Sequence, residues 1–88
     1  MQITVEISFY PLSEQFGNHV LDFLSDLRGE SDVSIMTNQM STQITGDYDQ
    51  VMSLVNAALK QNFQKGYKAS VVMKIFNEGL ELKWLDLA

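Results

Sequence analysis

The sequence has 88 residues, 45% of them hydrophobic, and a formal net charge of −5. This length indicates a single domain, and a domain so small gains stability from association. The six Lys and Arg residues are scattered and form no basic stripe for nucleic acid, and the lack of cysteine excludes disulfides and thiolate metal sites.

The first quarter of the chain predicts a strand followed by a helix. Residues from Ile3 to Phe9 alternate between apolar and polar types, as in a strand with one buried face, and Pro11 is expected to end this strand. From Ser13 onward the apolar residues recur at helical spacing, which predicts a helix that Gly29 stops.

A β-hairpin is predicted next. Residues 32–36 and 40–45 each alternate in type, and the polar residues 37–41 form the turn that joins them. The Thr, Asn and Ser side chains of this turn either satisfy their own backbone or bind a small polar ligand, and the sequence leaves both interpretations open.

The second half repeats the helix and strand pattern. Asp47 is expected to cap a helix whose apolar stripe runs from Val51 to Phe63 and which ends near Gly66. Residues 69–76 alternate as a fourth strand. The order predicts an α+β fold, a ferredoxin-like βαββαβ sandwich over residues 1–79, with a four-stranded antiparallel sheet and two helices on one face.

The last residues, 80–88, form an apolar tail beyond this complete fold. Their Leu and Trp residues fit one side of either a strand or a helix. An exposed apolar segment of this kind is typical of a contact with another chain, so we expect it at an oligomer interface, and the alternative is that it packs on its own sheet.

The sheet face opposite the helices is the candidate ligand surface. By strand alternation it carries aromatic and thioether groups beside carboxylate, amide and hydroxyl groups, a mixture typical of small-molecule pockets: Glu6, Ser8, Tyr10, Met36, Asn38, Ser41, Gln43, Lys74 and Phe76. The alternatives are that this face is a dimer interface or is solvated.

Catalytic and metal-binding constellations are absent from the sequence. His19 is the only histidine and has no evident Ser or acid partner, so we expect a surface residue. The carboxylates are scattered and the glycines are isolated, so neither a metal site nor a phosphate loop is predicted. We therefore expect no enzyme and no cofactor.

Three segments of the chain resemble the thiamine-binding protein family. They are residues 8–12 (Ser-Phe-Tyr-Pro-Leu), residues 37–49 and the pair Val51 and Met52. More narrowly, they are similar to YkoF-type domains, which bind thiamine and its hydroxymethylpyrimidine moiety, and to their single-domain relatives. The resemblance covers about residues 2 to 77. YkoF-type proteins carry two such domains in tandem, whereas this chain has one.

The resemblance implies a domain that associates through its sheets and holds its ligand with polar groups of the first strand and the hairpin. The residues of suitable type are Glu6, Ser8, Tyr10, Asn38, Ser41, Thr42 and Phe76. It also implies thiamine or a pyrimidine precursor as ligand and a dimer or tetramer, with a vitamin transporter as a further partner.

Two functions follow from the sequence. The first is non-catalytic binding of thiamine or a hydroxymethylpyrimidine-type precursor in vitamin supply. The second is a structural homo-oligomer of the same fold without a ligand. No apolar run is long enough to span a bilayer and the N-terminus lacks the basic and apolar blocks of a signal peptide, so we expect a cytoplasmic protein without membrane insertion.

Overall fold

The computed structural model describes residues 1–27 and 32–87. Its elements are β1 (Gln2–Leu12), α1 (Phe16–Leu27), β2 (Ser34–Thr37), β3 (Thr42–Asp47), α2 (Tyr48–Phe63) and β4 (Lys68–Phe76). The expected stop of the first helix at Gly29 lies outside the described residues. Within residues 1–27 and 32–87, no helix has the length and apolarity needed to cross a membrane.

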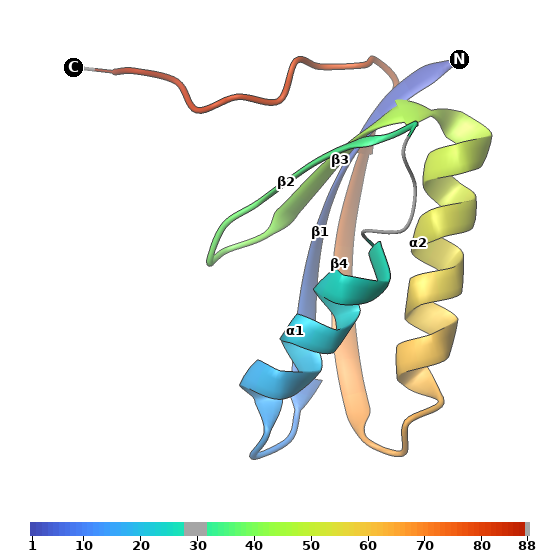
Figure 1. Ribbon diagram of the computed structural model, residues 1–88, viewed down its shortest axis with the longest axis vertical. Coiled ribbons are helices and arrows are strands. Elements are labelled where there is room, and N and C mark those ends of the chain that lie inside the picture. Colours follow the sequence, from blue (N-terminus) through green and yellow to red (C-terminus); the bar gives the residue numbers. More distant parts are fainter. Residues whose placement is uncertain (28–31, 88) are drawn as a thin grey trace.

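The four strands form one antiparallel sheet in the order β2-β3-β1-β4, and both helices pack on the same face (Figure 1). The predicted ferredoxin-like arrangement is confirmed. β1 lies at the centre because its apolar alternation supplies the main buried row, in which Ile3, Val5 and Ile7 are at most 1% exposed. These side chains pack against Phe23 and Leu27 of α1 and against the apolar stripe of α2.

The start of α2 follows the predicted capping chemistry. The side chain of Asp47 accepts a hydrogen bond from the N–H of Asp49 at 3.2 Å, which satisfies one of the free donors of the first turn. At the other end Gly66 has a φ of +90°, a left-handed conformation that glycine adopts without steric cost, and the chain turns there toward β4.

Pro11 does not end β1, contrary to the expectation from sequence. The strand continues to Leu12, and Pro11 pairs with Ala69 of β4. β3 pairs with β1 only from Gln2 to Ile7, so the side of β1 away from β4 has no neighbouring strand at Pro11 within the described residues. A proline nitrogen directed to that side removes no ladder hydrogen bond, and the strand therefore tolerates it.

The tail is neither strand nor helix within residues 80–87. The N–H of Leu80 donates to Thr4 Oγ1 at 2.8 Å, and the same hydroxyl donates to the carbonyl of Glu78 at 2.8 Å. Beyond this anchor the chain projects away from the body (Figure 1). Trp84, Leu85 and Leu87 are each at least 70% exposed.

Candidate functional site

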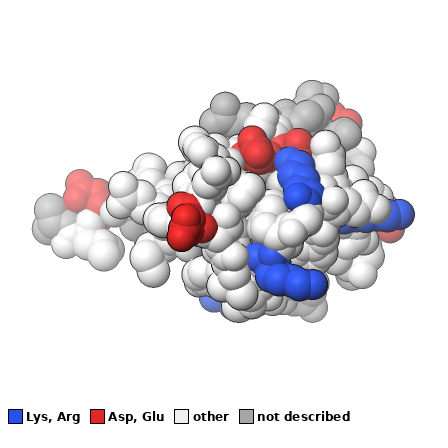
Figure 2. Space-filling view, turned by 90° about the horizontal axis from the view of Figure 1, so that it is seen from below, with Lys and Arg blue, Asp and Glu red and all other residues white. Residues whose placement is uncertain are grey.

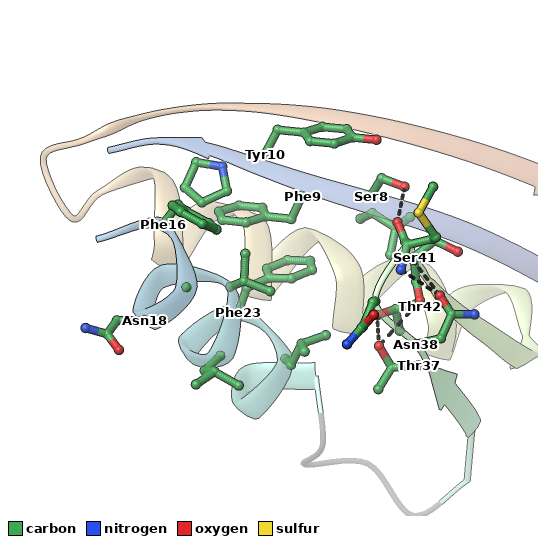
Figure 3. A pocket seen from close by; sticks show the side chains of 18 of the residues that line it. Ser8, Phe9, Tyr10, Phe16, Asn18, Phe23, Thr37, Asn38, Ser41 and Thr42 are labelled. Atoms are coloured by element: carbon green, nitrogen blue, oxygen red, sulfur yellow. Dashed lines mark hydrogen bonds between the residues drawn. The ribbon is translucent and has the colours of Figure 1, made fainter. Parts of the chain in front are cut away.

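The unequal lengths of β1 and β3 leave a hollow beside the end of β1. Beside the first residue of β3, Thr42, the hairpin turn, the second half of β1 and α1 line an open cavity of about 770 Å³, which we call the wedge pocket (Figure 3). Its volume lies within the roughly 300–1,000 Å³ that small-molecule pockets span. Its described lining includes no Asp, Glu, Lys, Arg or His side chain.

The apolar wall of the wedge pocket comes from β1 and α1. The rings of Phe9 and Phe23 stack with centroids 4.5 Å apart and an interplanar angle of 7°, and Phe16 lies beside them (Figure 3). Because β3 is absent beside the end of β1, this part of α1 faces a cavity instead of a strand. Sequence reasoning assigned these rings to the core and did not predict them at a site.

The polar end of the wedge pocket is the turn between β2 and β3. Asn38 Oδ1 accepts hydrogen bonds from the N–H groups of Met40 at 2.7 Å and Ser41 at 3.1 Å, and the Asn38 N–H donates to the Ser41 carbonyl at 3.0 Å. The turn interpretation of Asn38 is thus confirmed. Its amide nitrogen makes no hydrogen bond within the described chain and remains a donor for a ligand.

Two hydroxyl contacts hold this turn against β1 and β3. Ser8 Oγ donates to the carbonyl of Met40 at 3.3 Å, and the hydroxyls of Thr37 and Thr42 lie 2.7 Å apart (Figure 3). Thr42 is 3% exposed and sits in the same inward row as Ile44, so it faces the helices. The position of the turn therefore depends in part on a contact, that of Ser8 with Met40, which spans 32 residues of sequence.

A second hollow of about 580 Å³ lies on the open sheet face, and we call it the open-face pocket. It is lined by Glu6 and Lys74, which are paired across β1 and β4, together with Phe76 and Leu80. The Lys74 Nζ lies 3.2 Å from Oε1 of Glu6. This pair places one charge of each sign beside apolar surface.

Glu6 connects the two pockets. Ser41 Oγ donates to Glu6 Oε2 at 3.0 Å, and Ser41 itself lines the wedge pocket. The hydrogen bond from Ser41, followed by that from the Lys74 ammonium, holds the pKa of Glu6 below its ordinary value of 4.5. The carboxylate is therefore ionised at neutral pH, and the exposed Lys74 ammonium offsets only part of its charge.

The predicted site residues fall into two groups. Five of them line the wedge pocket: Ser8, Tyr10, Asn38, Ser41 and Thr42. Glu6 and Phe76 line the open-face pocket. We expected Asn38 to share the open face with Glu6 and Tyr10, but it lies after the end of β2, where strand alternation no longer sets the direction of a side chain.

His19 is half-buried and not a free surface residue. Its ring stacks on Tyr67 with centroids 3.8 Å apart and an interplanar angle of 17°, and neither His19 Nδ1 nor the Tyr67 hydroxyl has a hydrogen-bond partner in the described chain. Burial, followed by the nearby Asp22 and Asp26 carboxylates, raises the pKa of Tyr67. The same described residues contain no group of three or more His, Asp or Glu side chains placed to hold a metal.

Charged side chains do not gather into a basic patch on the face seen from below in Figure 2, where they lie among uncharged residues. The composition agrees, with six Lys and Arg against eleven Asp and Glu residues. Neither pocket therefore offers the cluster of cations that a polyphosphate or a nucleic-acid backbone requires.

Comparison with known proteins gives both a family and a fold. The sequence model of the family described as thiamine-binding protein matches residues 5–78. A Streptococcus pneumoniae protein of known structure superimposes with a TM-score of 0.80 at 20% identity, over 91% of this chain and 89% of that one. No curated protein matches the sequence.

Two further solved structures share the fold. A Thermotoga maritima protein with a proposed role in thiamine biosynthesis or salvage has a TM-score of 0.80 at 14% identity, over 93% of this chain and 91% of that one. A Bacillus cereus domain of unknown function has a TM-score of 0.74 at 20% identity, over 90% and 78% of the two chains.

Proposed function

We propose, from the premise that this chain belongs to the thiamine-binding protein family, that it binds thiamine or a hydroxymethylpyrimidine-type precursor without converting it. The observation that supports this proposal is the wedge pocket, an apolar cavity without ionised lining groups that ends at a polar turn. Ser41 is the lining hydroxyl that is bonded to a carboxylate, and this carboxylate, Glu6, is itself paired with Lys74, which agrees with a binding role without turnover.

The chemistry of an aminopyrimidine suits this cavity. The ring presents nitrogen acceptors beside an amine donor; β1 supplies the hydroxyl of Ser8, and the turn supplies the hydroxyl of Ser41 and the amide of Asn38. The ring faces would contact the apolar wall, where aromatic contacts add to area burial. A neutral heteroaromatic ring enters without the desolvation cost that an ion would incur in the same cavity.

The thiazolium half of thiamine carries a positive charge and calls for a different surface. Glu6 is hydrogen-bonded to Ser41 at the edge of the wedge pocket, and Phe76 lies near it on the open face. A carboxylate and an aromatic ring both favour a cation. Phosphorylated thiamine should bind more weakly than thiamine, because Lys74 is already paired with Glu6.

Isothermal titration calorimetry with thiamine, the free hydroxymethylpyrimidine and thiamine diphosphate tests this function. Ser8→Ala should weaken thiamine binding by roughly tenfold through loss of one hydrogen-bonding group. Ser70→Ala is the matched control, because Ser70 is exposed on the neighbouring strand and lines neither pocket. Equal affinities in the two variants would remove the wedge pocket as the site, and tighter binding of the diphosphate would refute the charge argument.

The second candidate is a structural homo-oligomer, a dimer or tetramer, without a ligand. It is favoured by apolar residues left exposed on the open-face side, among them Val72 at 61% and Phe76 at 46%. Exposed apolar groups that lie together are typical of interfaces. Sedimentation with and without thiamine separates the two functions: an oligomer that shows no heat of binding and no thermal shift with any of the three compounds supports the structural role.

A further inference from the structure

Beneath part of α1 the sheet contains fewer strands than at its opposite end. β1 runs from Gln2 to Leu12, but β3 pairs with it only as far as Ile7. Along residues 9–12 β1 has β4 on one side and, in the part of the chain that the structure describes, no strand on the other. In Figure 1 the β2-β3 hairpin diverges from β1 here, beside α1.

The free edge of β1 directs hydrogen-bonding groups into this gap. On the β3 side, the carbonyl of Met1 accepts the N–H of Tyr48 at 2.9 Å. Because backbone directions alternate along a strand, Phe9 presents both its N–H and its carbonyl to the gap. Pro11 presents only a carbonyl, since it has no N–H. An edge of this kind can pair with a further strand.

The side chains around the gap are apolar and exposed. Leu12 is 69% exposed, and on α1 Phe16 is 63% and Leu21 is 65% exposed. All three line the wedge pocket, whose described lining bears no ionised group. A strand added beside β1 would turn one face toward α1 and the other toward solvent, so it should be apolar on one face and polar on the other.

The tail of this chain has that pattern. In residues 80–84 Leu80, Leu82 and Trp84 alternate with Glu81 and Lys83. The segment is in no strand or helix, and it projects from the body in the two views of Figures 1 and 2. The N–H of Leu80 is bonded to Thr4, and beyond it the backbone takes part in no strand or helix. Trp84, which is 71% exposed, gains by burial.

The geometry favours the tail of another copy over the chain's own tail. Leu80 is anchored at Thr4, and Phe9 lies five residues farther along β1, roughly 17 Å at the rise of a strand. In the chain's own tail, residues 80–84 would be needed to span the distance from Thr4 to Phe9. The alternating segment would therefore end before it could pair with residues 9–12. A second copy can place the whole alternating segment there.

We propose that residues 80–84 of a second copy dock as an added strand beside residues 9–12 of β1, with Trp84 packed beneath α1. The proposal names the occupant of the gap beside residues 9–12 and does not rest on thiamine binding. This gap is the end of the wedge pocket lined by Leu12, Phe16 and Leu21, whereas the turn that offers polar groups to the proposed ligand, residues 37–41, forms the other end. It also differs from association through the open sheet faces, because the docking surface lies between β1 and α1.

Trp84 is the only tryptophan, so its fluorescence reports directly on the surroundings of the tail. With the full chain, we expect the emission to shift to shorter wavelength as concentration rises, in step with dimer formation measured by sedimentation. In Leu21→Lys the concentration at the midpoint should rise by roughly tenfold or more, because a charge would enter an apolar contact. Leu21→Met keeps the apolar contact and should retain the wild-type midpoint.

Amide hydrogen exchange at Phe9 supplies the second readout. The Phe9 N–H should exchange more slowly in concentrated protein than in dilute protein, and this difference should be lost in Leu21→Lys. A fluorescence shift that is independent of concentration would place the tail on its own chain and overturn the proposal. Two other results would also overturn the proposal: a concentration-dependent shift without protection of the Phe9 amide, and a concentration-dependent shift that is the same in Leu21→Lys. In either case the tail would dock elsewhere, for example on the open face.

Discussion

Asn38 allows the turn and the ligand roles of one side chain to be separated by two substitutions. Asn38→Ala removes the acceptor of two backbone N–H groups, at 2.7 and 3.1 Å. Both groups are exposed to water, so each bond contributes about 0.5–1 kcal/mol, the lower part of the usual range. We expect Asn38→Ala to lower the free energy of unfolding by about 1–2 kcal/mol.

Asn38→Asp keeps an oxygen acceptor for the same two N–H groups and removes the amide donor. The free energy of unfolding should therefore stay close to wild type, whereas thiamine affinity should fall by roughly tenfold if the amide nitrogen contacts the ligand. Urea unfolding followed by circular dichroism measures the first quantity, and calorimetric titration with thiamine measures the second.

The two results have separate meanings. A loss of stability below about 0.5 kcal/mol in Asn38→Ala would refute the argument that the Asn38 oxygen holds the turn. Unchanged thiamine affinity in Asn38→Asp would restrict Asn38 to its turn role, and the hydroxyls of Ser8 and Ser41 would remain as the polar groups of the proposed site.

Three further outcomes are expected. Tyr67→Phe should raise the free energy of unfolding by about 1 kcal/mol in urea titration, because it removes a buried hydroxyl without a described partner; a loss of stability would show that the hydroxyl is satisfied. Phe23 is 1% exposed, so Phe23→Ala should lower the free energy of unfolding by about 3–5 kcal/mol in the same titration. A loss below about 2 kcal/mol, the size expected for removal of a methyl group, would contradict the packing described. The pKa of Glu6 in the folded protein lies below 4.5, so the stabilisation by its carboxylate is present above pH 4.5 and is lost as the pH falls through the folded-state pKa. In Glu6→Gln, the free energy of unfolding should therefore depend less on pH below 4.5. The same pH dependence in Glu6→Gln and wild type would refute a contribution from Glu6.

The sequence by itself determined the elements and their order. The alternation around Ile3, Val5 and Ile7 predicts a one-faced strand because side chains in a strand point to opposite faces in turn, and the structure buries this row. Asp47 was predicted as a helix cap for an equally local reason, the match between a carboxylate and the free N–H groups that follow it. Strand alternation and helix capping each depend on only a few neighbouring residues, so the sequence alone reveals them.

Only the tertiary structure decided the wedge pocket. Its existence depends on where β3 stops along β1, and the register that pairs Ile7 with Thr42 joins segments 35 residues apart in sequence. The same register explains why Pro11 is tolerated inside β1 and why Phe16 and Phe23 of α1 reach a cavity. Periodicity assigns a side chain to a face of its own element, but it contains no information on how far the neighbouring strand extends, and that length decides whether the face meets a strand or an open cavity.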